Sequence, residues 1–308
     1  MPKFNLSRQA IFNVLLPLVL FGVGPFVYGN QSVIFQMMAY LVLAQGINIL
    51  YGFTGYLPFG YVGFFGSGAY AAGVLMLHTG MPPLLAVLLA GVAAAVLGLV
   101  LTPLLRLEGP YFAIGSLAAS QIVYYVISNP KLRPITNGPY GLDLHRDYNA
   151  VASYWTMFAV VILVTVFVQW LKHAHLGLSL LAIKDDPISA GMAGVHVVRE
   201  RGLAWLISAF IAGIAGGVFA WHLSVFYPHT VFNLSISIFA IVFTLFGGGA
   251  TVLGPILGVV VLYGLYNFIG ISAPQYFQLL YGLLIVLLVL FLPNGVVSLL
   301  RRRGIHVG

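Results

Sequence analysis

Apolar runs of about 20 residues recur from one end of this sequence to the other. A helix of that length crosses the hydrocarbon core of a bilayer. Soluble domains carry about 25% charged residues, whereas this chain carries 6%. The runs are apolar on every face, so they do not alternate as the strands of a membrane barrel would. The sequence therefore predicts an all-α polytopic membrane protein with a single transmembrane domain over residues 1–308.

About ten segments have the length and composition of membrane spans, and glycine, proline and charged residues gather in the loops between them. The first segment follows two basic residues, as the core of a signal peptide would. Its length and the lack of a small-x-small cleavage site favour a retained first helix. The expected segments lie near residues 10–28, 33–51, 57–77, 83–102, 110–128, 151–171, 203–221, 235–247, 255–270 and 277–299.

Basic residues are distributed unevenly between the two sets of loops. With the amino terminus inside, ten of the 13 lysines and arginines fall in cytoplasmic segments. This bias is typical of membrane proteins, so the net charge of +7 does not require a nucleic-acid-binding function. The sequence thus predicts a multi-pass protein with cytoplasmic termini, a cytoplasmic loop at 172–202 and an external loop at 129–150. The ten residues are Lys3, Arg8, Arg106, Lys172, Lys184, Arg199, Arg201, Arg301, Arg302 and Arg303, and the external three are Lys131, Arg133 and Arg146.

The ionisable residues disfavour both ion-coupled transport and enzymatic chemistry. A proton-coupled carrier normally keeps an ionisable group inside the bilayer, but no acid lies in the middle of an expected span. Cysteine and a Walker A motif are absent, and "KHAH" (172–175) is interpreted as an interfacial cluster rather than a metal site. This chain is therefore expected to be no enzyme and to hold no metal or other cofactor. The acids are Glu108, Asp143, Asp147, Asp185, Asp186 and Glu200.

Two glycine-rich stretches resemble each other. "GFTGYLPFGYVGFFGSGAY" (52–70) follows the second expected span, and "GGGATVLGPILGVVVLY" (247–263) follows the eighth. Glycine-interrupted segments in corresponding halves of a transporter point to its central pathway. The alternative is ordinary close packing of helices through small residues.

The segment "LAIKDDPISAGMAGVHVVRER" (181–201) is unusually polar for this chain. Asp185 or Asp186 could cap a helix, with Pro187 in its first turn. Small residues follow, and Gly194 could end the helix. We expect a short cytoplasmic helix with a compact face that docks into a groove on a partner. The alternative is a plain solvated loop.

Five stretches together resemble the permeases of ATP-binding-cassette importers, specifically the M-type chain of the branched-chain amino acid family. The polar segment is similar to their coupling loop, and "LAQGINILYGFTGYLPFGYVGFFGSGAY" (43–70) to their first glycine-rich block. "LEGPYFAIGSLAASQIVYYV" (107–126) is similar to the next helix and "ITNGPYGL" (135–142) to an external turn. "LAWLISAFIAGIAGGVFA" with "FTLFGGGATVLGPILG" (203–220 and 243–258) is similar to the carboxy-terminal half.

This resemblance implies a permease subunit in the inner membrane of a prokaryote. It would form the path for branched-chain or related hydrophobic amino acids by alternating access. The implied partners are a second permease chain of the H type, two cytoplasmic ATPases that bind ATP and Mg²⁺, an external or periplasmic substrate-binding protein, and membrane lipid. The coupling helix matches residues 182–194. The residues expected to contact the ATPase are Lys184, Asp185, Asp186, Pro187, Ala190, Gly191 and Gly194.

The resemblance also suggests residues for the path and the external turn. Serines in the path could instead bond to carbonyls of their own helix, and the external turn could have no partner. The expected path residues are Thr54, Gly55, Tyr56, Gly60, Tyr61, Ser116, Ser120, Gln121, Gly247, Gly248, Gly249 and Thr251. The expected external residues are Thr136, Gly138 and Gly141.

Several positions depart from the family pattern. Tyr56, Pro58 and Tyr61 stand where the family usually has Gln, Ser and His, and Gln121 stands where an acid is common. Pro187 replaces what is more often an acid. If the first four line the path, the ligand would be larger or less polar than leucine. An aromatic acid, an amide or urea is the alternative substrate, and a stand-alone carrier or channel or a membrane enzyme is the alternative class.

Overall fold

The computed structural model describes residues 8–27 and 29–272, together with 279, 282, 283, 286 and 295–297. The described part of the chain is built from helices, with one very short pair of strands. The long helices are α1 (Arg8–Val27), α2 (Gln31–Ile47), α3 (Val62–Thr79), α4 (Pro83–Val100), α5 (Pro110–Ile127), α7 (Ala150–His173), α8 (His175–Asp185), α10 (Val197–Leu223), α12 (Leu234–Gly247) and α13 (Leu253–Ser272). The short elements are η1 (Asn48–Gly52), η2 (Thr102–Arg106), η3 (Pro130–Leu132), α6 (Arg133–Thr136), η4 (Gly138–Tyr140), β1 (Leu142–Asp143), η5 (His145–Asp147), α9 (Pro187–Met192), β2 (Val225–Phe226) and α11 (Pro228–Val231).

The helical, polytopic class is confirmed. Within the described residues, seven segments are long and apolar enough to cross a membrane. The segments expected at 10–28 and 57–77 are helical as α1 and α3 but are not among these seven. Most of the segment expected at 277–299 lies outside the described residues, so the total of about ten spans stays a prediction. The seven are Gln31–Gly52, Pro83–Val100, Pro110–Ile127, Ala150–His173, Val197–Leu223, Pro228–Gly247 and Leu253–Gly270.

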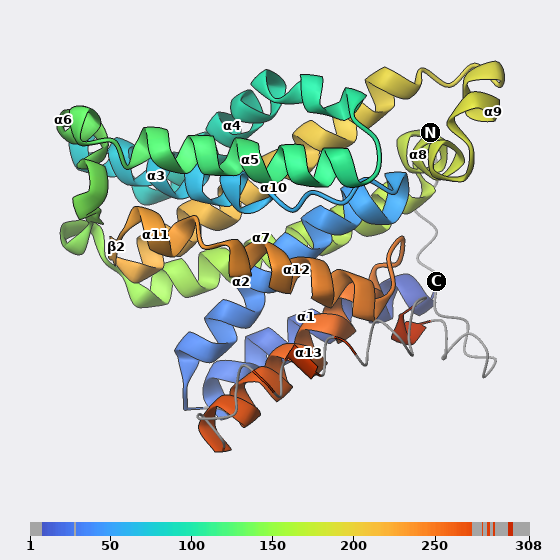
Figure 1. The fold of residues 1–308 in the computed structure, drawn as a ribbon. Coiled ribbons are helices and arrows are strands. Elements are labelled where there is room, and N and C mark those ends of the chain that lie inside the picture. Colours follow the sequence, from blue (N-terminus) through green and yellow to red (C-terminus); the bar gives the residue numbers. More distant parts are fainter. Residues whose placement is uncertain are drawn as a thin grey trace.

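Helix α10 lies at the centre of the molecule and packs on α3 and α4, with α5 beside α3 (Figure 1). Small residues allow this close approach, because a Cβ on Gly216 would lie 1.9 Å from the carbonyl oxygen of Phe65. The indole Nε1 of Trp205 donates to the carbonyl of Gly98 at 2.8 Å, which fastens α10 to α4. On the other side, α12 and α13 pack against each other and against α2.

The two ends of the bundle differ in structure. One end carries α6, β1, β2 and α11, and the other carries α8 and α9 (Figure 1). At the first end β1 pairs antiparallel with β2, which places Leu142 opposite Phe226. Gly141 precedes this pair with a φ of +75°, and a Cβ there would lie 2.3 Å from the carbonyl oxygen of Phe226. Glycine is therefore required at this position.

Candidate functional site

The two glycine-rich breaks meet in space. Helix α2 ends in η1, a single π-helical turn that closes at Gly52, while α12 ends at Gly247 and α13 begins at Leu253. A Cβ on Gly52 would lie 2.5 Å from the amide nitrogen of Ala250, and one on Gly249 would lie 3.2 Å from the Cα of Gly52. The backbones of the two breaks are therefore in direct contact. We call this contact, formed by residues 48–52 and 247–252, the break junction.

Two buried amides in α2 and η1 hold the break junction together. Asn48 Nδ2 donates to the carbonyl of Thr251 at 2.8 Å, and Asn48 Oδ1 accepts from the amide of Ala250 at 2.8 Å. Gln45 Nε2 donates to the carbonyl of Val252 at 2.9 Å. Both amides are fully buried. These two amides were not predicted from the sequence, although two amides three residues apart in an apolar run are a recognisable signal.

The predicted path residues in the second break shape its turn. Gly248 has a φ of +110°, and a Cβ on Gly247 would lie 1.8 Å from the carbonyl oxygen of Gly254. Thr251 Oγ1 donates to the carbonyl of Gly248 at 2.8 Å and accepts from the amide of Gly254 at 3.0 Å. These residues form a compact link between α12 and α13.

Lys184 joins the polar segment to the break junction. Its Nζ donates to the carbonyl oxygen of Gly52 at 2.8 Å and lies 5.9 Å from the centre of the Tyr51 ring. Partial burial lowers the pKa of Lys184, and the neighbouring carboxylate of Asp185 raises it in part. The contact connects the last turn of α8 directly to the end of η1.

The expected helix at 182–194 is divided in two. Residues up to Asp185 complete α8, Asp186 is extended at φ −156° and ψ 108°, and α9 begins at Pro187. The proline explains the break, because its ring disfavours helical geometry in the residue before it. Of the two expected caps it is Asp186 that caps α9, accepting from the amide of Ile188 at 2.9 Å. Its pKa is lowered by the Ser189 hydroxyl and then by the backbone amides of Ile188 and Ser189.

The end of α9 has the expected glycine. Gly194 has a φ of +90°, and the next amide, that of Val195, donates back to the carbonyl of Ala190 at 3.0 Å. Ala190 is buried, and a Cβ on Gly191 or Gly194 would meet no atom within 4 Å. Two further residues of α9 were not predicted from the sequence: Ile188 and Met192 lie four residues apart and are 76% and 81% exposed.

The first glycine-rich block lines a cavity of about 830 Å³. Tyr56 is nearly buried in its wall, where its ring packs edge-on against Phe112 with centroids 4.9 Å apart. The guanidinium of Arg201 lies 4.7 Å from the centre of the Tyr56 ring, and Nη1 donates to the Tyr56 hydroxyl at 3.1 Å. We call this space the Arg201 cavity. It is lined by Tyr51, Thr54, Gly55, Tyr56, Leu57, Phe59, Glu108, Gly109, Pro110, Phe112, Ala113, Ile114, Leu117, Ile183, Lys184, Pro187 and Arg201.

Three other residues predicted for the path, Gly60, Ser116 and Ser120, are buried between helices. Ser116 Oγ donates to the carbonyl of Ala113 and Ser120 Oγ to that of Leu117, both at 2.8 Å, as the alternative interpretation expected. A Cβ on Gly60 would lie 1.8 Å from the carbonyl oxygen of Ser116.

Tyr61 and Gln121 complete the predicted path residues. Tyr61 is buried, and its hydroxyl donates to the carbonyl of Ser208 at 2.8 Å, whereas Gln121 is half-buried on α5. Neither residue lines the Arg201 cavity. A role of either residue in the path stays a prediction.

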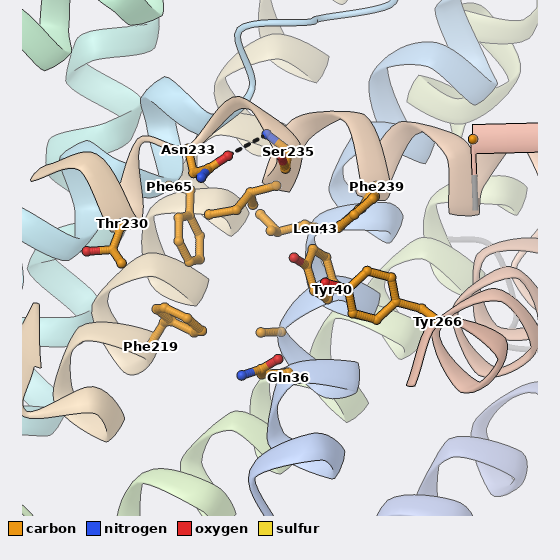
Figure 2. A pocket seen from close by; sticks show the side chains of 13 residues that line it. Gln36, Tyr40, Leu43, Phe65, Phe219, Thr230, Asn233, Ser235, Phe239 and Tyr266 are labelled. Atoms are coloured by element: carbon orange, nitrogen blue, oxygen red, sulfur yellow. Dashed lines mark hydrogen bonds between the residues drawn. The ribbon is translucent and has the colours of Figure 1, made fainter. Parts of the chain in front are cut away.

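A second cavity, of about 560 Å³, lies between α2, α10 and α12 (Figure 2). Figure 2 shows rings of Phe65 and Phe219 on one side and of Tyr40 and Tyr266 on the other, with Gln36 between Phe219 and Tyr266 and with Asn233 and Ser235 above the rings. No charged side chain is found among its described lining residues. We call it the α2–α12 cavity. It is lined by Gln36, Ala39, Tyr40, Leu43, Phe65, Phe219, Thr230, Asn233, Ser235, Ile236, Phe239, Tyr266 and Gly282.

The external turn is held by its own hydrogen bonds. Thr136 Oγ1 donates to the carbonyl of Ile127 at 2.8 Å and accepts from the amide of Gly138 at 3.3 Å. Asn137 Nδ2 donates to the carbonyl of Gly141 at 2.7 Å. The three residues predicted for this turn therefore fix its shape. Contact with a binding protein stays a prediction.

The described part of the chain contains no group of three or more histidines and acids that could hold a metal ion. Within "KHAH", the imidazole of His173 lies 3.5 Å from Gln169 Nε2, and Nδ1 of His175 lies 3.4 Å from the hydroxyl of Ser179. These contacts are to neutral side chains of neighbouring turns.

The chain is similar to known permease components. The family described as "Branched-chain amino acid transport system / permease component" matches residues 31–289. The high-affinity branched-chain amino acid transport system permease proteins LivM of Salmonella typhimurium and of Escherichia coli are each 28% identical, over 97% of this chain and 79% of theirs. The probable branched-chain amino acid transport permease protein LivH of Methanocaldococcus jannaschii is 25% identical, over 89% of this chain and 90% of its own. No solved structure matches the chain.

Proposed function

The chain belongs to the family of branched-chain amino acid transport permease components, and on that premise we propose that it forms the path for such solutes in an ATP-driven importer. The substrates would be branched-chain or related hydrophobic amino acids, moved by alternating access. The observation that carries this proposal is the bond from Lys184 Nζ to the Gly52 carbonyl, 2.8 Å long. It is a direct connection between the polar segment and the break junction.

A displacement of α8 and α9 would be transmitted through this bond. Lys184 would move the end of η1, and Asn48 would carry that movement to the turn between α12 and α13 through its two hydrogen bonds to residues 250 and 251. Because the α2–α12 cavity lies between α2 and α12, a relative shift of the two helices would change its width. This is a physically continuous route from the polar segment to a candidate binding cavity.

Helix α9 is the proposed docking element for a cytoplasmic ATPase. Its exposed Ile188 and Met192 form an apolar face that a groove on a partner would cover. The ATPase would supply the ATP and Mg²⁺ sites, and we place α8 and α9 in the cytoplasm of a prokaryotic cell. A second permease chain, two ATPases and an external binding protein complete the proposed complex.

The lining of the α2–α12 cavity favours a solute without net charge. Aromatic rings provide apolar walls, and hydroxyl and amide groups such as those of Thr230 and Asn233 provide hydrogen-bond partners (Figure 2). A hydrophobic amino acid, whose ammonium and carboxylate groups balance each other, fits this lining. An amide or urea would fit the polar groups but would leave the rings unused, and an aromatic acid would find no cation among the described lining residues.

The test is the ATPase activity of the reconstituted complex with its neighbouring ATPases and binding protein, titrated with leucine, phenylalanine, an aromatic carboxylate and urea. Stimulation by leucine or phenylalanine is expected. Stimulation by the aromatic carboxylate or urea alone would support the importer but contradict the proposed substrate class. Transport by the purified chain without any ATPase would replace the importer with a stand-alone carrier.

A further inference from the structure

The Arg201 cavity has an apolar wall that runs along one helix. Four of its lining residues, Pro110, Ala113, Ile114 and Leu117, follow one another at helical spacing on α5, so they form a single stripe from the start of the helix inward. Ile114 is 65% exposed, which shows that the stripe is open to the surroundings. Leu57 also lines the cavity and adds to its apolar surface. The cavity is thus shaped as an apolar groove along a membrane-spanning helix.

The end of this groove at the start of α5 is cationic. Arg201 and Lys184 both line it, and among the described lining residues one carboxylate, that of Glu108, opposes them. Arg201 Nη1 is bonded to the Tyr56 hydroxyl, but its Nε is buried and has no hydrogen-bond partner. A buried guanidinium N–H without an acceptor is costly, and such groups in native proteins usually have a partner. The cavity lining therefore combines two cationic side chains with one guanidinium N–H that lacks an acceptor.

We propose that the Arg201 cavity binds a phospholipid with an anionic headgroup. The phosphate accepts hydrogen bonds from Arg201 and Lys184, and one acyl chain lies along the α5 stripe. A lipid is favoured over a soluble anion because it would cover the apolar stripe as well as the cationic end. The start of a spanning helix is also where headgroups lie, and basic pockets between helices on the cytoplasmic side bind such headgroups.

This inference rests on the proposed function, which places α8 and α9 on the cytoplasmic side. The same cavity is lined by Tyr56 beside the first break and by Lys184 and Pro187 of the polar segment. A bound lipid would therefore touch both the polar segment and the glycine-rich block. Coupling between the ATPase and the spans would then depend on anionic lipid.

The first test is lipid retention by the purified chain, measured by native mass spectrometry after exchange into phosphatidylglycerol or phosphatidylcholine. Wild type should retain phosphatidylglycerol, and Arg201→Gln should retain several-fold less, while Arg201→Lys keeps most of it. Ile114→Trp fills the groove at an exposed position without changing charge, and it should lower retention too. Arg199→Gln is the matched control, because Arg199 is exposed on α10 and lies outside the cavity lining.

The second test measures ATP-driven transport by the whole complex in nanodiscs of phosphatidylcholine with and without phosphatidylglycerol. Wild type should gain several-fold from the anionic lipid, and Arg201→Gln and Ile114→Trp should lose that gain. Equal retention in wild type and both variants would overturn the site, as would an equal loss in Arg199→Gln. If inorganic phosphate raised transport as much as phosphatidylglycerol does, the site would be assigned to a soluble anion and the lipid proposal would be wrong. Selective retention of phosphatidylglycerol, without ATP-driven transport in any lipid, would support the lipid site but contradict the proposed importer function.

Discussion

Asn48 Nδ2 donates to the carbonyl oxygen of Thr251 at 2.8 Å, across 203 positions of the chain. Its Oδ1 accepts from the amide of Ala250, so one side chain satisfies a donor and an acceptor of the same turn. The turn therefore cannot move away from η1 without losing both bonds. Asn48 is the residue that makes the two glycine-rich breaks a single structural unit.

Asn48→Leu should destabilise the protein and impair transport. The substitution keeps the volume of the side chain but leaves the Ala250 amide and the Thr251 carbonyl without partners in a buried place, at a cost of about 1–3 kcal/mol for each group. The thermal unfolding midpoint in detergent should fall. Asn267→Leu is the control, because Asn267 Nδ2 bonds to the carbonyl of Tyr263 within its own helix rather than across two segments. An equal fall in both variants would remove the special role of Asn48.

Lys184→Met should uncouple ATP hydrolysis from transport. It keeps the aliphatic stem of the side chain but removes the donor to the Gly52 carbonyl. We expect several-fold less solute moved per ATP, with normal assembly, and partial recovery in Lys184→Arg. Lys131→Met is the control, since Lys131 is exposed in η3, which directly precedes α6, and α6 lies at the opposite end of the bundle from α8 (Figure 1). Unchanged transport per ATP in Lys184→Met would exclude this bond from the proposed route.

Local sequence patterns were sufficient to predict α9. Its cap, its first-turn proline and its terminal glycine lie within nine residues, and each acts on its immediate neighbours. The structure differs from the expected helix in the break at Asp186. The same proline causes this break, because it constrains the residue before it. Such short-range effects can be read from one sequence.

The partners of buried polar side chains could not be predicted in this way. Asn48 and Tyr61 bond to backbone carbonyls 203 and 147 positions away, and nothing in the sequence near either residue indicates those partners. The structural role of each glycine was equally hard to predict from the sequence. The two glycine-rich stretches were predicted to belong to a central pathway, with close packing of helices as the alternative, and only the structure shows that Gly52 faces Ala250.

Gly216→Ala should destabilise the contact between α10 and α3. A Cβ at this position would lie 1.9 Å from the carbonyl oxygen of Phe65, so one backbone must shift, at a cost of about 1–3 kcal/mol for overpacking. Gly202→Ala on the same helix meets no atom within 4 Å and should be neutral or stabilising by up to about 1 kcal/mol. The unfolding midpoints of the two variants would be compared. A midpoint for Gly216→Ala at or above that of Gly202→Ala would contradict this packing.

Coupling should not depend on the ionisation of Asp186 between pH 5 and 8. Hydrogen bonds from Ser189 and from backbone amides lower the pKa of Asp186 below its ordinary value of 3.8. The carboxylate therefore stays ionised throughout this range, and its stabilisation of α9 is lost only as the pH falls through the lowered pKa. Asp186→Asn and Asp186→Ser can still cap and should keep transport per ATP, whereas Asp186→Ala should reduce it. Equal activity in all three variants would show that the cap is dispensable.

Asn233→Asp should discriminate between classes of substrate. Asn233 lines the α2–α12 cavity and caps α12 by accepting from the amide of Ser235 at 2.9 Å, and aspartate can accept the same bond (Figure 2). The substitution therefore adds one negative charge to the lining without removing the cap. The KM for leucine should change by roughly tenfold if the charges interact by about 1.4 kcal/mol: it should rise where the leucine carboxylate lies nearer to residue 233 and fall where the leucine ammonium does. An uncharged amide should be affected much less.

Asn149→Asp is the matched control for this experiment. Asn149 is also an exposed cap, accepting from the amide of Ala152 at 2.9 Å at the start of α7, but it lies outside the cavity lining. It should leave the KM for leucine unchanged. If Asn149→Asp changed the KM as much as Asn233→Asp, the effect would be a general one of surface charge. If neither variant changed it, neither charged group of leucine would bind near Asn233, and the α2–α12 cavity would lose its place on the proposed path.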